Sequence, residues 1–314
     1  MILRPLEQVC ILMVFAMIAI NTMLALSAGI SVAQPLIIAA IIITAMSLIT
    51  GLFFRTLKKD ETLSLLFLNT GILFLFSFSS VLYSHLLLPF SRPTIDPTLV
   101  RIDAMVGFHW PDIMTWAAQY PLVGSLTRAA YEASSWLVFA SFIVVALHRD
   151  HSRVYSFMLA IFISAFATIS IWSMFPSAGA SAYWSLPAEV EQSINPLVGT
   201  HYGQQLLSWY QTGFGDITTL HKNGLVGFPS YHTVMTLICI YGLWGYWKSM
   251  LIASPIIALT VPAIFIQGGH NLVDFVAGAL ITFAAVYGAQ KIVRRVDQPA
   301  TDQSVEPIAA AQNL

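Results

Sequence analysis

Charged side chains are scarce in this sequence. Asp, Glu, Lys and Arg make up 9% of the 314 residues, whereas hydrophobic residues make up 57% and the mean hydropathy is +0.75. A soluble domain carries about 25% charged residues. The composition therefore excludes an ordinary soluble enzyme and predicts an all-α polytopic membrane protein. We expect the lipid bilayer as its partner and no nucleic acid, and the sequence leaves its oligomeric state open.

Cysteine is also rare. Cys10 and Cys239 each lie in an apolar run, far from each other along the chain. This pattern excludes a disulfide framework and a thiolate metal site. We expect no metal and no other cofactor.

Long apolar runs are what the chain has in quantity. A membrane helix needs roughly 20 mostly apolar residues. About eight such runs are present: Val9–Gly29, Leu36–Phe54, Leu63–Leu88, Ala130–Leu147, Val154–Phe175, Ser230–Trp247, Leu251–Ile266 and Asn271–Ile292. The first could instead be a cleaved signal peptide, but its length and the run that follows at once favour an uncleaved helix.

The polar stretches between these runs divide the chain into three parts. Residues 1–126 are expected to hold the N-terminal transmembrane helices and an interfacial loop, whose charged and aromatic residues suit short helices at the membrane surface. Residues 127–296 are expected to form a catalytic transmembrane core. Its loop 176–227 is too long for an ordinary connection, which indicates a functional cover. Residues 297–314 are predicted to be a disordered cytoplasmic tail.

The few basic residues predict the orientation. With a cytoplasmic N-terminus, ten of the 14 Lys and Arg residues fall on the cytoplasmic side, as the positive-inside rule requires. Both termini are then cytoplasmic, and both long loops lie outside. We expect a bacterial inner (plasma) membrane protein whose active site faces the periplasm.

Two polar stretches flank a hairpin of otherwise apolar sequence. They are Gly227-Phe-Pro-Ser-Tyr-His232 and Gly268-Gly-His-Asn-Leu-Val-Asp274. His232 and His270 are 38 residues apart, so two membrane crossings return the chain to the same face. Asp274 follows His270 by four positions and shares one helix face with it. Two histidines and a carboxylate therefore converge at one depth.

The same stretches suit a phosphate ligand. Two helices begin near Ser230 and His270 and point their N-termini at one place, where unpaired amides and the helix dipole attract anions. Glycines such as Gly269 allow the backbone to approach a ligand closely.

These residues resemble a known family. Phe228-Pro-Ser-Tyr-His232 and His270-Asn-Leu-Val-Asp274 look like the second and third signatures of the type 2 phosphatidic acid phosphatase superfamily. The residues of both motifs are more similar to those of one branch of this superfamily, which contains inositol phosphorylceramide synthases and bacterial inositolphosphotransferase-like proteins. Phe175-Pro-Ser-Ala178 is similar to a loop motif of that branch.

The resemblance implies a role for each matching residue. His270 would be the nucleophile that forms a phosphohistidine, Asp274 would hold its ring, and His232 would be the general acid for the leaving group. Ser230 and neighbouring amides would hold the phosphate oxygens of a lipid-linked ester, next to Tyr231. The acceptor would be water in a phosphatase and a hydroxyl group in a phosphotransferase.

The sequence departs from the common phosphatase pattern in its basic residues. Ile264 stands where that pattern has an arginine, and no Lys-x6-Arg-Pro signature is present. Phosphoryl transfer needs positive charge around the equatorial oxygens. Lys222 is the first candidate to supply it, followed by Arg101, Arg128 and His221. Asp103 could bind substrate hydroxyls or cap a loop turn.

Two other functions fit the same polar residues. His232, His270 and Asp274 could bind a catalytic zinc ion with an open fourth position. Alternatively, they could line the pathway of a transporter or channel. Four other histidines, His85, His109, His148 and His151, are interpreted as structural.

Overall fold

The structure is a computed structural model that describes residues 3–88, 93–213, 215–220 and 224–297. Within those residues the chain is helical, and its only β-type pairing is a single bridge between Val32 and Ile217. The helices are α1 (Pro5–Ala28), α2 (Gln34–Phe53), the π-helix η1 (Phe54–Lys58), α3 (Glu61–Leu86), α4 (Asp96–Met105), α5 (Trp110–Ala118), α6 (Pro121–Leu147), α7 (His151–Met174), α8 (Ala180–Tyr183), α9 (Ala188–Ile194), α10 (Thr200–Thr212), α11 (Tyr231–Leu243), α12 (Trp247–Ile266) and α13 (Leu272–Asp297). The all-helical polytopic fold is confirmed.

Seven of the described helices are long and apolar enough to cross a membrane. The eighth predicted span, Ser230–Trp247, is shorter than expected. Its helix α11 has 13 residues and is therefore only about 20 Å long, against a hydrocarbon core of about 30 Å. Ser230 caps its start, and Gly245, with φ +92°, lies in the turn that follows its end.

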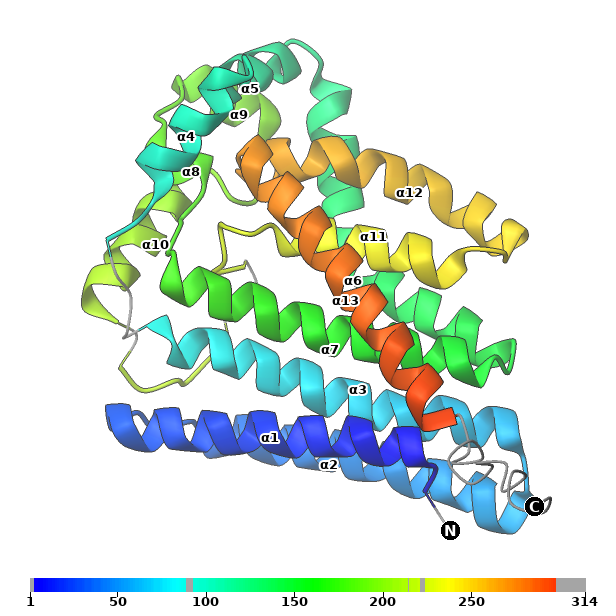
Figure 1. The fold of residues 1–314 in the computed structure, drawn as a ribbon. Helices are drawn as coiled ribbons and strands as arrows, with labels where there is room; N and C mark the ends of the chain where they lie inside the picture. Colours follow the sequence, from blue (N-terminus) through cyan, green and yellow to red (C-terminus); the bar gives the residue numbers. More distant parts are fainter. Residues whose placement is uncertain (1–2, 89–92, 214, 221–223, 298–314) are drawn as a thin grey trace, which may run out of the picture.

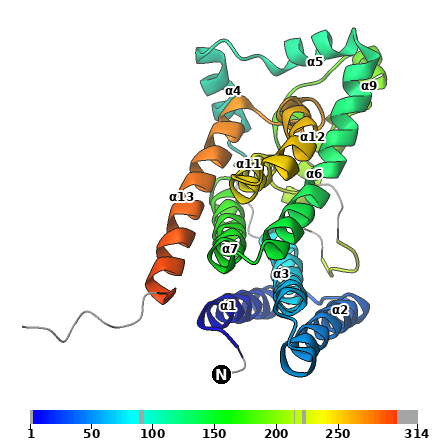
Figure 2. The ribbon, with the colours of Figure 1, turned by 90° about the vertical axis from the view of Figure 1, so that its right-hand side faces the viewer.

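Helix α7 lies at the centre of the bundle. It packs against α11 and α13 on one side and against α1 and α3 on the other, as the view along the helices shows (Figure 2). Its side chains from Val154 to Phe162 are nearly all buried. Helices α1, α2 and α3 form a separate layer beside this core (Figure 1).

The start of α1 and the end of α13 lie at the same end of the bundle (Figure 1). Arg4 Nη1 is 2.6 Å from Nδ1 of His151, and Ser152 Oγ donates to Asp297 at 3.1 Å. Both contacts are made to the start of α7, so both ends of the described chain meet there. This arrangement agrees with an even number of crossings, while the side on which the cytoplasm lies stays a prediction.

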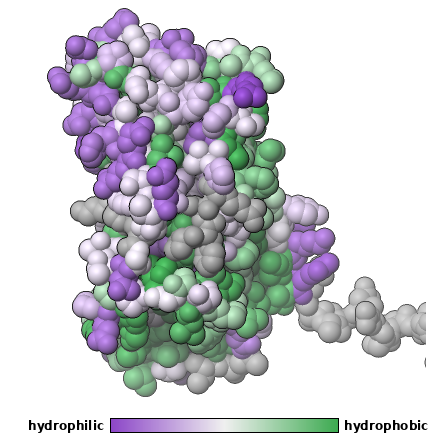
Figure 3. Space-filling model, turned by 90° about the vertical axis from the view of Figure 1, so that its left-hand side faces the viewer, coloured by the Kyte–Doolittle hydropathy of each residue, from purple (hydrophilic) through white to green (hydrophobic). Residues whose placement is uncertain are grey.

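Short helices cover the opposite end of the bundle. The connection after α3 forms α4 and α5, and the predicted cover 176–227 contains α8, α9 and α10. Figure 3 faces this end, and hydrophilic residues gather over its upper part. Helix α6 begins at Pro121, earlier than the predicted Ala130. The predicted cytoplasmic tail lies outside the described residues, except for Asp297 at the end of α13, and the three-part division stays a prediction.

Candidate active site

His270 and Asp274 form the most sharply defined part of the site. Nδ1 of His270 lies 2.8 Å from the carbonyl oxygen of Gly227 and 3.3 Å from Oδ2 of Asp274. Both oxygens are acceptors, so Nδ1 carries the hydrogen and donates it. In the neutral ring Nε2 then holds the lone pair, as a nucleophile requires.

The chain turn before α13 fixes these side chains. The backbone N–H of Asn271 donates to Oδ2 of Asp274 at 2.8 Å, and Asp274 is completely buried. Asp103 on α4 accepts the next two amides, from Leu272 at 2.7 Å and Val273 at 3.0 Å. The start of α13 is therefore held by two carboxylates, one from inside the helix and one from α4.

The start of α11 is joined to the start of α13. The backbone N–H of Ser230 donates to the carbonyl of Asp274 at 3.0 Å, and the Ser230 hydroxyl accepts from Thr233 N–H at 3.4 Å. A Cβ on Gly278 would collide with the carbonyl oxygen of Ser230, so the glycine permits this close packing. The predicted convergence of the two helix starts is confirmed.

His232 is the second residue of α11. Its ring stacks on Tyr131 of α6, with 3.8 Å between centroids and 22° between planes. His232 and His270 line the same cavity. Sequence reasoning did not find Tyr131, because its place depends on how α6 packs against α11.

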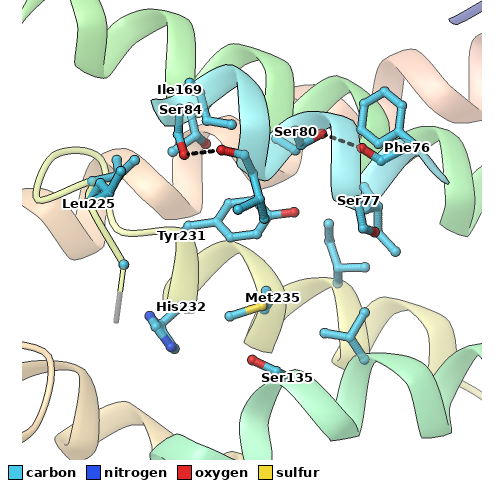
Figure 4. Close-up of a pocket in the computed structure, with 18 of the residues that line it drawn as sticks. Phe76, Ser77, Ser80, Ser84, Ser135, Ile169, Leu225, Tyr231, His232 and Met235 are labelled. Atoms are coloured by element: carbon cyan, nitrogen blue, oxygen red, sulfur yellow. Dashed lines mark hydrogen bonds between the residues drawn. The ribbon is translucent and has the colours of Figure 1, made fainter. Parts of the chain in front are cut away.

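The cavity has a volume of about 750 Å³ and is lined mainly by apolar side chains of α3, α6, α7 and α11. In the close-up, Tyr231 of α11 lies toward the serines of α3, which are Ser77, Ser80 and Ser84, whereas His232 lies on the other side of α11 (Figure 4). Trp136 on α6 also lines the cavity and is 76% exposed, so the cavity reaches the outer surface of the bundle. A long apolar ligand can therefore reach the two histidines from the side.

A buried carboxylate that sequence reasoning missed shapes the loop after α7. Asp96 on α4 accepts hydrogen bonds from the Ser177 hydroxyl at 2.6 Å and from the amides of Ala178 and Gly179, each at 3.1 Å. Burial raises the pKa of Asp96, although these hydrogen bonds act in the opposite direction. The amide of Gly227 donates to the carbonyl of Ser177 at 3.0 Å. The loop therefore positions Gly227, whose carbonyl oxygen accepts the hydrogen bond from Nδ1 of His270.

The predicted substrate-binding residues separate into several groups. Tyr231 lines the cavity, whereas Ser230 is fully buried as a helix cap and is not part of the cavity wall. Gly268 lines the cavity in place of Gly269, whose Cα faces Ser181 and Val198.

Arg101 and Asp103 lie together, but in a second pocket that shares no lining residue with the first. Burial also raises the pKa of Asp103.

The source of positive charge is not among the described cavity residues. The described part of the cavity wall contains three histidines, His85, His232 and His270, and no Lys or Arg. Arg128 instead bonds the Asn195 carbonyl and pairs with Glu132. The candidates Lys222 and His221 lie outside the described residues.

The zinc alternative finds little support in this geometry. Among the described residues, no three His, Cys, Asp or Glu side chains are grouped to hold a metal ion. His270 and Asp274 point their nearest polar atoms at each other, and Oδ2 of Asp274 already accepts two hydrogen bonds.

The comparisons with known proteins bear on the same residues. A family model described as the PAP2 superfamily matches residues 97–288, well over half of the chain. The matched range includes the whole His232, His270 and Asp274 constellation and begins upstream of the predicted core 127–296. No curated protein and no solved structure gave a match.

Proposed function

Because the chain belongs to the PAP2 superfamily, whose activities are of the phosphatase or phosphotransferase type, we propose that it transfers the phosphoryl group of a lipid-linked phosphate ester. The observation that carries the proposal is the fixed tautomer of His270. Its Nδ1 hydrogen is held by Gly227 and Asp274, which leaves Nε2 to attack phosphorus. Attack by a side chain divides one difficult transfer into two easier ones.

The first step forms the bond between Nε2 of His270 and phosphorus and breaks the ester P–O bond. His232 donates a proton to the departing oxygen. In the second step, water or an alcohol attacks phosphorus, His232 takes the proton of that nucleophile, and the N–P bond breaks. Asp274 stabilises the positive ring of the intermediate. Proton transfer of this kind contributes about 10² to 10⁴ to the rate.

The apolar cavity supports a lipid substrate. It runs from the two histidines to exposed side chains of α6, so an apolar tail can stay in contact with the membrane while its phosphate reaches His270. A substrate without a tail would leave this surface exposed to water, which is unfavourable.

Transfer to an alcohol, of the inositol phosphorylceramide synthase type, is the finer form of the proposal. It is supported by the motif Phe228–His232 and by Ile264 in place of the phosphatase arginine. Lys222 is our candidate for the missing charge. We place the reaction on the periplasmic face of a bacterial inner membrane, because of the distribution of basic residues.

The test is mass spectrometry of lipid products from membranes with wild type or His270→Ala, given mixed phospholipids and a chelator. We expect a new phosphate-bearing lipid that depends on His270; release of free phosphate instead would identify a phosphatase. His148→Ala is the matched control, because His148 stacks on Tyr246 outside the cavity. Equal products from wild type and His270→Ala would refute the mechanism and favour a transporter. Loss of wild-type activity in chelator would favour the metal enzyme.

A further inference from the structure

A second pocket lies among α4, α5 and α8, on the hydrophilic end of the molecule. Its volume is about 240 Å³, below the 300–1,000 Å³ of sites for drug-sized ligands. Its wall includes Arg101, Asp103, Phe108, Tyr183, Trp184 and Asn271. Such a volume suits one ring or a small headgroup, and not a lipid tail.

One buried polar group in this wall has no partner. Asn271 is 1% exposed, and its side-chain nitrogen has no hydrogen bond to any part of the chain that the structure describes. Leaving a buried donor unpaired costs free energy, so such groups in native proteins call for a ligand, water or ion. Asn271 therefore offers an unused donor at this pocket.

The other polar groups supply both a donor and an acceptor. Arg101 is a donor only, whereas Asp103 is an acceptor. Each oxygen of Asp103 accepts one backbone amide and retains a second lone pair, because an ionised carboxylate has about four acceptor sites. Hydroxyl groups both donate and accept, so a ligand with several hydroxyls matches this set.

The charges and the aromatic side chains of the pocket narrow the class of ligand further. Arg101 and Asp103 carry opposite charges, so the pocket favours neither an anion nor a cation. Trp184 meets Tyr183 and His109 edge to face, at centroid distances of 5.1 and 4.9 Å. These fixed aromatic side chains offer a flat apolar surface to the C–H face of a ring.

We propose that this pocket binds a neutral polyhydroxylated ring, such as a sugar or a cyclitol. The ring lies against Trp184, and its hydroxyls contact Arg101, Asp103 and Asn271. The site is distinct from the catalytic cavity, but Asp103 and Asn271 also hold the start of α13, directly beside His270. The proposal does not depend on the proposed reaction, because binding is measured without turnover.

Calorimetric titration of the purified full-length protein in detergent tests the proposal. The probes are myo-inositol and glucose as neutral rings, inorganic phosphate as an anion and choline as a cation. Wild type should bind at least one neutral ring saturably. Arg101→Gln and Trp184→Leu should each weaken this binding at least about tenfold, through loss of a charged donor and of the ring surface respectively.

Matched variants serve as controls. Arg128→Gln and Trp116→Leu change the same residue types outside the pocket and should bind as wild type does, as should His270→Gln. The proposal is overturned if wild type binds no neutral ring up to about 100 mM, far weaker than a millimolar site. It is also overturned if phosphate or choline binds in place of the rings, if Arg101→Gln and Trp184→Leu bind like wild type, or if His270→Gln abolishes binding.

Discussion

Replacing Asp274 by Asn separates two roles of this carboxylate. Asn has almost the same shape and keeps one oxygen to accept the Asn271 amide, which is 2.8 Å from Oδ2 in the structure. The Nδ1 hydrogen of His270 also keeps the Gly227 carbonyl at 2.8 Å. The substitution therefore removes the negative charge and largely preserves the tautomer and the orientation of the ring.

The distance of 3.3 Å between Nδ1 and Oδ2 sets the size of the effect. At an effective dielectric constant of about 20, unit charges at this distance attract by about 5 kcal/mol. Loss of this whole attraction would lower the rate by at most about 10⁴, because each 1.36 kcal/mol corresponds to a tenfold change in rate. Desolvation of the buried pair offsets part of it, so we expect kcat to fall by about 10² to 10³.

The assay measures phosphate transfer from a lipid phosphate in mixed micelles, with thermal unfolding followed on the same samples. Asp216→Asn is the matched control, because Asp216 is exposed and bonds only Ser31 among its described contacts. If kcat of Asp274→Asn fell less than tenfold, the hydrogen bond to the Gly227 carbonyl would be enough to hold His270 in its active state. That result would refute the argument that the charge of Asp274 stabilises the intermediate. A fall accompanied by a large loss of thermal stability would show a structural role instead.

Three further substitutions test other parts of the site. Gly179→Ala should abolish activity, because Gly179 has φ +88° and a Cβ would lie 2.6 Å from the Gly269 carbonyl oxygen; Gly213→Ala, also at positive φ but with no atom within 4 Å, should retain activity in the same assay. Burial raises the pKa of Asp96 above its ordinary 3.8, so its contribution to stability is complete below that pH and is lost as the pH rises through the raised pKa. The difference in Tm between wild type and Asp96→Asn should therefore shrink as the pH rises above 3.8, and a growing difference would contradict this sign. Ser80→Leu narrows the cavity and should raise KM for a long-chain lipid phosphate at least about tenfold without affecting a short soluble ester; equal effects on both would show general damage.

The parts of the site that the sequence predicted depend on short-range or length rules. The pairing of His270 with Asp274 follows from the helical repeat, and the return of the chain from His232 to His270 follows from membrane thickness. The helical repeat holds whatever the rest of the chain does, whereas α11, with 13 residues, is shorter than the length rule assumes, although the chain still returns to the same end of the bundle. The family match over residues 97–288 agrees with the region that these rules identified.

The parts that the sequence did not predict depend on contacts between distant segments. Nothing near Gly227 in the chain indicates that its carbonyl accepts from His270, since loop 176–227 must fold first. Asp103 was expected either to bind a ligand or to cap a turn, and only the packing of α4 on α13 shows that it caps a helix 169 positions away. Helix α11 is short because the chain turns at Gly245, and the hydropathy of the sequence does not predict this turn.

The position of α3 has a consequence for specificity. The family match begins at residue 97, so α1, α2 and α3 lie outside it, yet Ser80 and Ser84 of α3 form one wall of the cavity. The proposed reacting groups, His232 and His270, lie in the matched region, whereas part of the surface that a lipid tail would touch lies outside it. If the proposed function holds, we expect substitutions on α3 to change the preference for a lipid tail and to leave His232 and His270 in place. We therefore expect the residues of α3 to determine which lipid tail is preferred, and those of α11 and α13 to determine the reaction.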